Sequence, residues 1–389
     1  MKKSLRKYCT GCGLCTSLTG IPLTETGTGF VRVADLKDET INHICETICP
    51  ASGKHIKYLS TSPWGEYNGK YAAFAKDEVI RFKAASGGVT TAIASFLIDK
   101  GFVDGVIQVG KSEDPFATCV YCNTTKEEVI NCSGSRYIVA SPLSTIFQVI
   151  EKGGKYAFIG RPCDVLALRQ YMHINPSVEN SIYIMLSFFC AGSPSITASK
   201  KLVSRLNVSE KECKEIRYRG EGWPGKTTVT DKNGHKTSME YSDSWNNILG
   251  RDVMPICKFC ADGVGEFADI SSGDLWYLSD EKTPSFNEQP GRNITFTRTK
   301  IGYDVMQMAV IDGYISISDY KDDDLAYVQP YHANRKRLLL PKILAMKTMM
   351  QICPDYKIHD LIRLTKGIKF TKMTKTFLGT IKRILKKTI

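Results

Sequence analysis

The sequence has no apolar run long enough to span a membrane, and it lacks a motif for a nicotinamide cofactor. No Gly-x-Gly-x-x-Gly follows a predicted strand and there is no P-loop; Gly263-x-Gly265-x-x-Ala268 is a partial match that lies beside a C-x2-C pair. The six histidines are scattered, with no pair at metal-ligand spacing on one helix. Cysteines, rather than the apolar segment of a secretory signal, follow the basic N-terminal residues. We therefore expect a cytoplasmic protein without a histidine metal site, and direct use of NAD(P)H is not supported.

Acidic residues are absent from the end of the chain. Residues 361–389 contain nine Lys or Arg and no Asp or Glu, so nine of the twelve net positive charges lie in this tail. The remaining 360 residues are close to neutral. This distribution does not suggest a nucleic-acid-binding protein, and no nucleic-acid partner is expected.

Fourteen cysteines are abundant for an intracellular chain, in which disulfides are rare. Short, repeated C-x2-C spacings indicate metal or redox chemistry better than buried structural thiols do. The length of 389 residues favours two or three units. We expect a ferredoxin-like module at 1–60, an α/β domain at 61–330 and a basic helical extension at 331–389.

The α/β assignment depends on apolar strand-like runs that alternate with helical patterns, which is typical of a largely parallel sheet. The expected strands are 71–75, 103–109, 155–159 and 182–189, and the expected helices are 88–100, 141–152 and 164–171. Two polar, β-rich runs flank Asn233-Gly234, which is a strong hairpin signal.

The first cysteine group lies at the N-terminus. Cys9, Cys12 and Cys15 form a C-x2-C-x2-C loop that can bind one corner of a cubane, and Cys49-Pro50 offers the remote fourth ligand typical of bacterial ferredoxins. Thr19 stands where a ferredoxin would have a further cysteine, so one [4Fe–4S] cluster is expected here. A zinc site with four thiolates remains an alternative.

A second group is predicted from sheet geometry. Cys163 and Cys190 each follow a predicted strand, so both would lie at the carboxyl edge of the sheet, where open α/β sheets bind ligands. Cys257-x2-Cys260 adds two thiolates on a loop. Together the four could hold a second [4Fe–4S] cluster, although each alone could be an ordinary buried cysteine.

Seven motifs in order resemble the coenzyme F420 hydrogenase/dehydrogenase beta-subunit family, which includes the F420-reducing hydrogenase beta subunit and 7-hydroxymethyl chlorophyll a reductase. They are 86–91 (SGGVTT), 103–106 (VDGV), 134–137 (GSRY), 160–163 (GRPC) with 168–169 (LR), 189–192 (FCAG), 257–260 (CKFC) and 268–274 (ADISSGD). The resemblance covers roughly residues 1–310. It implies FAD and cubane clusters and does not imply one substrate; bacterial members are often associated with polysaccharide pathways.

Two segments are candidates for the flavin. Ser86-Gly87-Gly88 opens a helix through Val89 and Thr90, and bare backbone N–H groups there could bind a pyrophosphate. In the segment Gly134-Ser135-Arg136-Tyr137, Arg136 could pair with a phosphate and Tyr137 could stack on a ring. A plain helix start and a plain turn are the structural alternatives.

Other residues have no assigned role. Cys119, Cys122 and Cys132 are read as structural, and the role of Cys45 is open. His332 or His55 could donate a proton, and Asp274 with Trp276 could line the second cluster or the flavin.

The tail segment from Lys369 to Lys387 predicts an amphipathic helix. Phe370, Met373, Phe377, Ile381, Ile384 and Leu385 share one face, and the opposite face carries Lys369, Lys372, Lys375, Lys382, Arg383, Lys386 and Lys387. Such a helix suits the inner, anionic face of a membrane, or it docks on its own protein.

These observations predict an iron–sulfur flavoprotein that takes electrons from a donor such as reduced ferredoxin, through two [4Fe–4S] clusters and FAD, to a small organic acceptor. The alternative is an electron-transfer subunit of a partner enzyme, with no substrate site of its own. Whether the chain forms a homo-oligomer is open.

Overall fold

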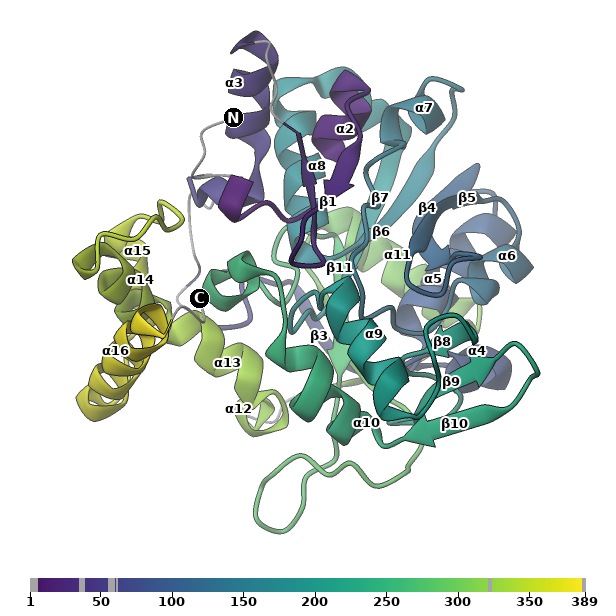
Figure 1. Ribbon diagram of the computed structural model, residues 1–389. Helices are drawn as coiled ribbons and strands as arrows, with labels where there is room; N and C mark the ends of the chain where they lie inside the picture. Colours follow the sequence, from purple (N-terminus) through teal and green to yellow (C-terminus); the bar gives the residue numbers. More distant parts are fainter. Residues whose placement is uncertain (1–5, 35–38, 55–59, 61, 321–323, 387–389) are drawn as a thin grey trace.

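The computed structural model describes residues 6–34, 39–54, 60, 62–320 and 324–386 (Figure 1). His55 and Lys387, which the sequence analysis singled out, lie outside these ranges. Within the described part, no helix combines the length and apolarity needed to cross a membrane.

An eight-stranded mixed sheet forms the centre of the molecule, in the order β13-β3-β12-β11-β7-β6-β4-β5. Strands β11, β7, β6 and β4 run parallel, whereas β5 at one edge and β12, β3 and β13 at the other pair antiparallel. The bounds are β3 Gly69–Ala75, β4 Gly105–Lys111, β5 Thr118–Asn123, β6 Tyr156–Gly160, β7 Ile182–Phe188, β11 Ile270–Asp274, β12 Asn293–Thr297 and β13 Ile315–Asp319. The four predicted strands are present, and the antiparallel flanks were not predicted.

Helices cover both faces of this sheet. On one face, α5 (Val89–Asp99) and α11 (Lys300–Ile311) pack on apolar side chains of β3, β4 and β7. On the other face lies α8 (Pro162–Ile174), the crossover between the parallel strands β6 and β7. This crossover brings the ends of β6 and β7 to one edge, as the sequence predicts.

The predicted helix over 141–152 is shorter in the structure, where α7 spans Ile146–Ile150. Ser141 does not begin a helix because its hydroxyl donates to the carbonyl of Gly11 at 2.8 Å. Similarly, the N–H of Leu143 donates to the carbonyl of Cys12 at 2.9 Å. The segment before α7 therefore binds the N-terminal cysteine loop and leaves the helical conformation.

The N-terminal segment forms a small unit beside α8. It contains α2 (Leu14–Thr19), the hairpin β1 (Leu23–Glu25) and β2 (Val31–Val33), and α3 (Glu39–Ile48). Few of its side chains are buried, and Leu14 and Ile48 join the core under α8. The unit therefore depends on contacts with the rest of the chain. Figure 1 shows the unit next to α8.

A second sheet has the order β10-β9-β8, with bounds β8 Cys213–Arg217, β9 Thr227–Asp231 and β10 Lys236–Met239. The turn between β9 and β10 contains the predicted Asn233-Gly234, and Gly234 has a φ of 87°. Helix α9 (Ile196–Arg205) packs on this sheet through Leu202 and Val203.

The C-terminal helices form a separate layer at one side of the molecule (Figure 1). Their bounds are α12 Leu325–Val328, α13 Pro330–Arg337, α14 Leu339–Thr348, α15 Ile358–Leu364 and α16 Phe370–Leu385. Met373 and Ile384 of α16 pack into a core shared with α14 and with Ile256 and Phe259. The predicted amphipathic helix is present, and part of its apolar face docks on its own protein.

Candidate functional site

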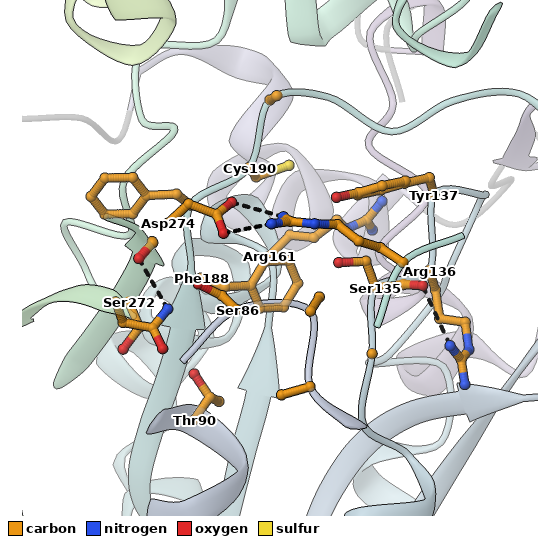
Figure 2. Close-up of a pocket in the computed structure, with 18 of the residues that line it drawn as sticks. Ser86, Thr90, Ser135, Arg136, Tyr137, Arg161, Phe188, Cys190, Ser272 and Asp274 are labelled. Atoms are coloured by element: carbon orange, nitrogen blue, oxygen red, sulfur yellow. Dashed lines mark hydrogen bonds and ion pairs between the residues drawn. The ribbon is translucent and has the colours of Figure 1, made fainter. Parts of the chain in front are cut away.

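The main cavity, of about 440 Å³, lies at the carboxyl edge of the parallel strands. Gly160 at the end of β6, Phe188 at the end of β7 and Asp274 at the end of β11 line it. Figure 2 shows residues from these strand ends around one space. The volume falls in the range of small-molecule and cofactor sites, and the position is the one expected for ligands of open α/β sheets.

Both segments predicted for the flavin reach this cavity. Ser86, Gly88, Val89 and Thr90 line it at the start of α5, and Gly134, Ser135, Arg136 and Tyr137 line it from the loop before α7. Gly87 does not line the cavity. A Cβ there would come within 2.7 Å of the Asn293 Oδ1 and 2.9 Å of the Ala73 carbonyl, so Gly87 permits close packing of the loop on the sheet.

Arg136 has the features of an anion ligand. Its Nε is buried without a hydrogen-bond partner, and one terminal nitrogen donates only to the carbonyl of Ser135, at 3.4 Å. Burial lowers the pKa of Arg136 from its usual value, with a smaller opposing effect from Cys132. Glu215 also has a smaller opposing effect, but no ion pair of Arg136 is found among the described residues, so its guanidinium is suited to a phosphate. Cys132, read as structural from sequence, also lines the cavity here.

Asp274 and Arg219 form a buried ion pair that also lines the cavity, and dashed lines mark it at Asp274 in Figure 2. Two guanidinium nitrogens of Arg219 donate to the two carboxylate oxygens at 2.8 Å each, and the Trp223 Nε1 donates to the same carboxylate at 2.9 Å. The guanidinium lies over the rings of Tyr241 and Trp276, at 4.6 and 4.9 Å from their centroids. The sequence left a lining role for Asp274 open, and it missed Arg219, which belongs to no motif.

His332 is a further buried group at the cavity. Its Nδ1 lies 2.9 Å from the Gln329 Oε1, and its Nε2 has no partner. The Gln329 side-chain amide donates to the carbonyl of Asp274, so its oxygen faces His332. With the amide in this orientation, the Gln329 Oε1 accepts a hydrogen bond from the Nδ1–H of His332. Burial, and next the charge of Arg335, lowers the pKa of His332 to about 3, so it is not a general acid near neutral pH.

The four cysteines of the second predicted group converge beside this cavity. Cys163 lies in the first turn of α8, and Cys190 lies just after β7 and lines the cavity. Cys257 lies in the short 3-10 helix η5 (Pro255–Phe259), and Cys260 directly follows that helix. Burial raises the pKa of all four thiols, to about 11 for Cys190 and about 12 for Cys260. The Cys190 and Cys260 thiols each raise the pKa of Cys163, and the Cys257 thiol raises the pKa of both Cys190 and Cys260. The four therefore form one cluster of side chains, described below as the second thiol set.

The N-terminal cysteines form the first thiol set. Cys9, Cys12, Cys15 and Cys49 line one small cavity of about 20 Å³ together with Ala167 of α8. Burial raises the pKa of Cys12 to about 12, and the other three thiols add to the burial effect on Cys49. Cys45 is buried beside Cys15, whose pKa is raised first by a hydrogen bond with Cys45 and then by burial.

The donor chemistry of both sets fits an iron–sulfur cluster. Thiols with raised pKa values lose their protons only when a cation compensates the thiolate charge, so the sets suit a bound metal. In the described residues, no three His, Cys, Asp or Glu side chains gather closely enough to hold one metal ion. A cubane needs less convergence because each cysteine binds a different iron atom.

Arg161 connects the two sets. Its guanidinium bonds the Asp164 carboxylate at 2.8 Å, the Ala140 carbonyl at 2.9 Å and the Thr10 carbonyl, between Cys9 and Cys12, at 3.4 Å. The Cys163 and Cys190 thiols also interact electrostatically with this guanidinium, and both raise the pKa of Arg161. The buried pair of Arg161 and Asp164 thus holds the N-terminal loop against the start of α8.

The remaining cysteines lie apart from these sites. Cys119 and Cys122 lie on the edge strand β5 and are exposed, Cys213 is buried in β8, and Cys353 lies between α14 and α15. None of them lines either cavity.

Two family models match the chain. The model described as coenzyme F420 hydrogenase/dehydrogenase, beta subunit N-term, matches residues 70–148, and its C-terminal counterpart matches residues 153–323. Together they span more than half of the chain. The N-terminal unit and the helices from α12 onward lie outside both.

Similar proteins share about a quarter of their residues with this chain. The coenzyme F420 hydrogenase subunit beta of Methanosarcina barkeri is 27% identical over 64% of this chain and 81% of its own length. The F420-dependent formate dehydrogenase 1 subunit beta of Methanococcus maripaludis is 26% identical over 64% of this chain and 61% of its own length.

The fold is shared with a solved structure. A chain of the F420-reducing [NiFe] hydrogenase complex from Methanosarcina barkeri matches with a TM-score of 0.58 and 23% identity. The match covers 74% of this chain and 94% of that chain. The likeness therefore extends over most of the mixed α/β architecture.

Proposed function

Because the chain belongs to the coenzyme F420 hydrogenase/dehydrogenase beta-subunit family, we propose that it is an iron–sulfur flavoprotein that transfers electrons within an oxidoreductase complex. Named relatives are subunits of a hydrogenase and of a formate dehydrogenase, which supports an electron-transfer subunit over a reductase that acts alone. Partner proteins would then donate electrons to this chain and accept electrons from it. The donor would be a ferredoxin-type protein.

One observation carries the proposal: three sites adjoin each other along α8. Ala167 of α8 lines the cavity of the first thiol set, Cys163 in its first turn belongs to the second set, and Cys190 of that set lines the main cavity. This continuity offers a short route from the first thiol set to a ligand in the main cavity.

We propose that Cys9, Cys12, Cys15 and Cys49 bind one [4Fe–4S] cluster, and that Cys163, Cys190, Cys257 and Cys260 bind another. FAD would occupy the main cavity, where Arg136 would pair with its diphosphate and the start of α5 would approach it. The clusters supply single electrons and the flavin exchanges either one or two. The chain itself would hold these groups next to one another, and His332 Nε2 lies at the cavity without a hydrogen-bond partner among the described residues.

A reductase with its own small-molecule acceptor is the second candidate. Aromatic side chains support it, because Trp276, Phe286 and Tyr241 line the same cavity, and the ring of Phe286 is 43% exposed. Such rings could bind a planar acceptor beside a flavin.

Anaerobic purification followed by iron, sulfide and flavin analysis tests the proposal. We expect about eight iron atoms per chain, as two cubanes require, and one FAD. Zinc without visible absorption would contradict it. The substitution Cys163→Ala should halve the iron content, and loss of both clusters or of neither would show that the cysteines are grouped wrongly. Reoxidation of the reduced flavin by small acceptors, without a partner protein, would favour the reductase.

We further propose that α16 contacts an anionic membrane surface. Phe370, Leu378 and Leu385 are 79%, 57% and 69% exposed, although other apolar residues of α16 pack on α14. Lys375, Lys382 and Lys386 are exposed on the same helix. Exposed apolar side chains beside lysines suit the interface of an anionic bilayer.

A further inference from the structure

Arg335 of α13 is a buried cation beside the second thiol set. It is 6% exposed, and its guanidinium donates to the backbone carbonyls of Cys190 at 2.9 Å and Ala191 at 3.2 Å. Its positive charge lowers the pKa values of the Cys190, Cys257 and Cys260 thiols. Three of the four sulfur atoms therefore lie within its electrostatic reach.

Among the described residues, Arg335 forms no ion pair with an Asp or Glu. The largest charge effects on its pKa come from the thiols of Cys260, Cys190 and Cys257 and from the Tyr331 hydroxyl. The next residue, Lys336, differs because it forms a buried ion pair with Glu266. A buried guanidinium without an acid is costly unless another negative group lies nearby. The four sulfur atoms of the second thiol set are the candidates.

The backbone makes room for this arrangement at Gly263. A Cβ at position 263 would come within 1.4 Å of a terminal nitrogen of Arg335, so any larger residue would displace the guanidinium. The N–H of Cys190 donates to the Gly263 carbonyl at 2.9 Å, which fixes the glycine beside the thiols. Gly263 has no positive φ that would require glycine. Its contact with Arg335 is the constraint that the structure shows.

Lys342 of α14 adds a second cation on the same side. Its Nζ donates to the carbonyl of Lys258, between Cys257 and Cys260, at 3.2 Å. Burial, and next the charges of Arg335 and Arg383, lower the pKa of Lys342 to about 8, whereas the Cys260 thiol has a smaller opposing effect. Both cations belong to helices outside the residues that the family models match.

The first thiol set has a different environment. Arg32 has a small lowering effect on the pKa of Cys9. The Asp164 carboxylate raises the pKa of Cys12, and it also raises that of Cys163 in the second set. The largest charge effects on the pKa values of Cys12 and Cys49 come from Asp164 and from neighbouring thiols, and not from a cation. The two sets thus differ in the charge that surrounds them.

We propose that Arg335, assisted by Lys342, is the counter-charge of an iron–sulfur cluster at the second thiol set and gives that cluster a higher reduction potential than the first. This inference rests on the proposed function. A cubane with four thiolates is negatively charged, and reduction adds one more negative charge, so a fixed cation stabilises the reduced state more than the oxidised state. Electrons that arrive at the first set are then drawn toward the main cavity.

An anaerobic redox titration followed by electron paramagnetic resonance tests this. Arg335→Gln should lower the midpoint potential of one of the two cluster signals, the one that Cys163→Ala removes, and should leave the other unchanged. Arg335→Lys keeps the charge and should restore most of the difference. Lys347→Gln is the matched control, because it removes an exposed cation from α14 and should shift neither signal.

Gly263→Ala provides an independent variant that retains Arg335 but displaces its guanidinium, so it should lower the potential of the same signal. If Arg335→Gln loses the second cluster while Arg335→Lys keeps it, the counter-charge role is supported. Loss from both alike, or an unchanged potential in Arg335→Gln, overturns it. A wild-type protein without clusters would overturn the proposed function itself, whereas two clusters with an unmoved potential would overturn this inference alone.

Discussion

At the scale of single residues, two buried polar atoms without hydrogen-bond partners indicate where a polar ligand could bind. Arg136 Nε and His332 Nε2 both lie at the main cavity and have no hydrogen-bond partner in the described part of the chain. Unpaired polar groups of this kind cost about 1–3 kcal/mol each when they stay unpaired. Their shared position at one cavity favours a polar ligand there over two unrelated defects.

Replacing Arg136 should weaken flavin retention. Arg136→Gln keeps much of the side-chain volume but removes the charge, and hydrogen bonds to charged groups contribute about 1.5–3 kcal/mol. We therefore expect FAD to bind at least about tenfold more weakly. Titration of the apoprotein with FAD, followed by fluorescence, measures this. Lys226→Gln, at an exposed ion pair with Glu240, is the control and should bind FAD like the wild type; equal affinity in Arg136→Gln would contradict the assignment.

The residue scale also shows what a sequence can and cannot reveal. Cys9, Cys12 and Cys15 were recognisable because one short loop supplies three ligands, so their spacing alone carries the geometry. Cys163 and Cys190 required a correct sheet topology, which β6, α8 and β7 provide. Arg335 and Gly263 were missed because their contact joins distant segments and no motif contains Arg335. The partial nucleotide motif at Gly263 was already set aside from the sequence, because it lies beside the C-x2-C pair.

At the scale of secondary-structure elements, the loops after β3 and β6 position the sites through caps and turns. Helix α4 (Glu78–Lys83) precedes the loop with Ser86 and Gly88, and Asp77 caps it. The Asp77 carboxylate accepts from the N–H groups of Val79 at 3.0 Å and Ile80 at 3.1 Å. It also pairs with Lys126 of α6 (Lys126–Asn131) at 3.2 Å. This one carboxylate therefore ties two helices together near the main cavity.

Asp77→Ala should destabilise the protein by about 1 kcal/mol at neutral pH, as loss of an N-cap does. Burial opposes the charge of Asp77, but the helix N–H groups and Lys126 outweigh it and lower its pKa. Because the folded-state pKa lies below the unfolded value of about 3.9, the contribution is complete above that pH and is lost as pH falls further. Urea unfolding of the wild type and Asp77→Ala from pH 7 to pH 3 measures the difference. Asp77→Asn, which keeps a capping acceptor, should lose less; an effect that grows toward low pH would contradict the sign.

Elements were predicted well where their own residues determined them. The strands β3, β4, β6 and β7 and the helices α5, α8 and α16 follow from apolar periodicity and from glycine stops. Helix α7 was predicted too long because the N-terminal cysteine loop captures the backbone of 141–143 by hydrogen bonds. The strands β11 and β12 were not predicted because buried polar residues such as Ser271, Ser272 and Thr295 interrupt their apolar pattern.

At the scale of the whole molecule, charge is arranged by layer. The C-terminal helices carry most of the net positive charge, and they contribute it in two ways. Arg335 and Lys342 point inward to the second thiol set, whereas Lys375, Lys382 and Lys386 are exposed to solvent. The same layer can therefore tune an internal site and present a basic surface.

Vesicle binding tests the outward role. We expect the protein to co-sediment with vesicles that contain phosphatidylserine and not with vesicles of phosphatidylcholine alone, since each Lys near an anionic surface contributes about 1 kcal/mol. The double substitution Lys375→Glu and Lys382→Glu should lower the partition coefficient by more than about tenfold, and 0.5 M salt should weaken wild-type binding through screening.

The apolar contribution needs its own variant. Phe370→Ser with Leu378→Ser removes exposed side chains without disturbing Met373 or Ile384, which pack toward α14, so the fold should be retained. If α16 enters the bilayer interface, this variant should bind anionic vesicles more weakly even at low salt, because buried apolar area is part of the affinity. Unchanged binding would restrict the contact to electrostatics. Equal sedimentation with both kinds of vesicle, or with neither, would contradict the membrane role and leave α16 as a helix that docks on its own protein.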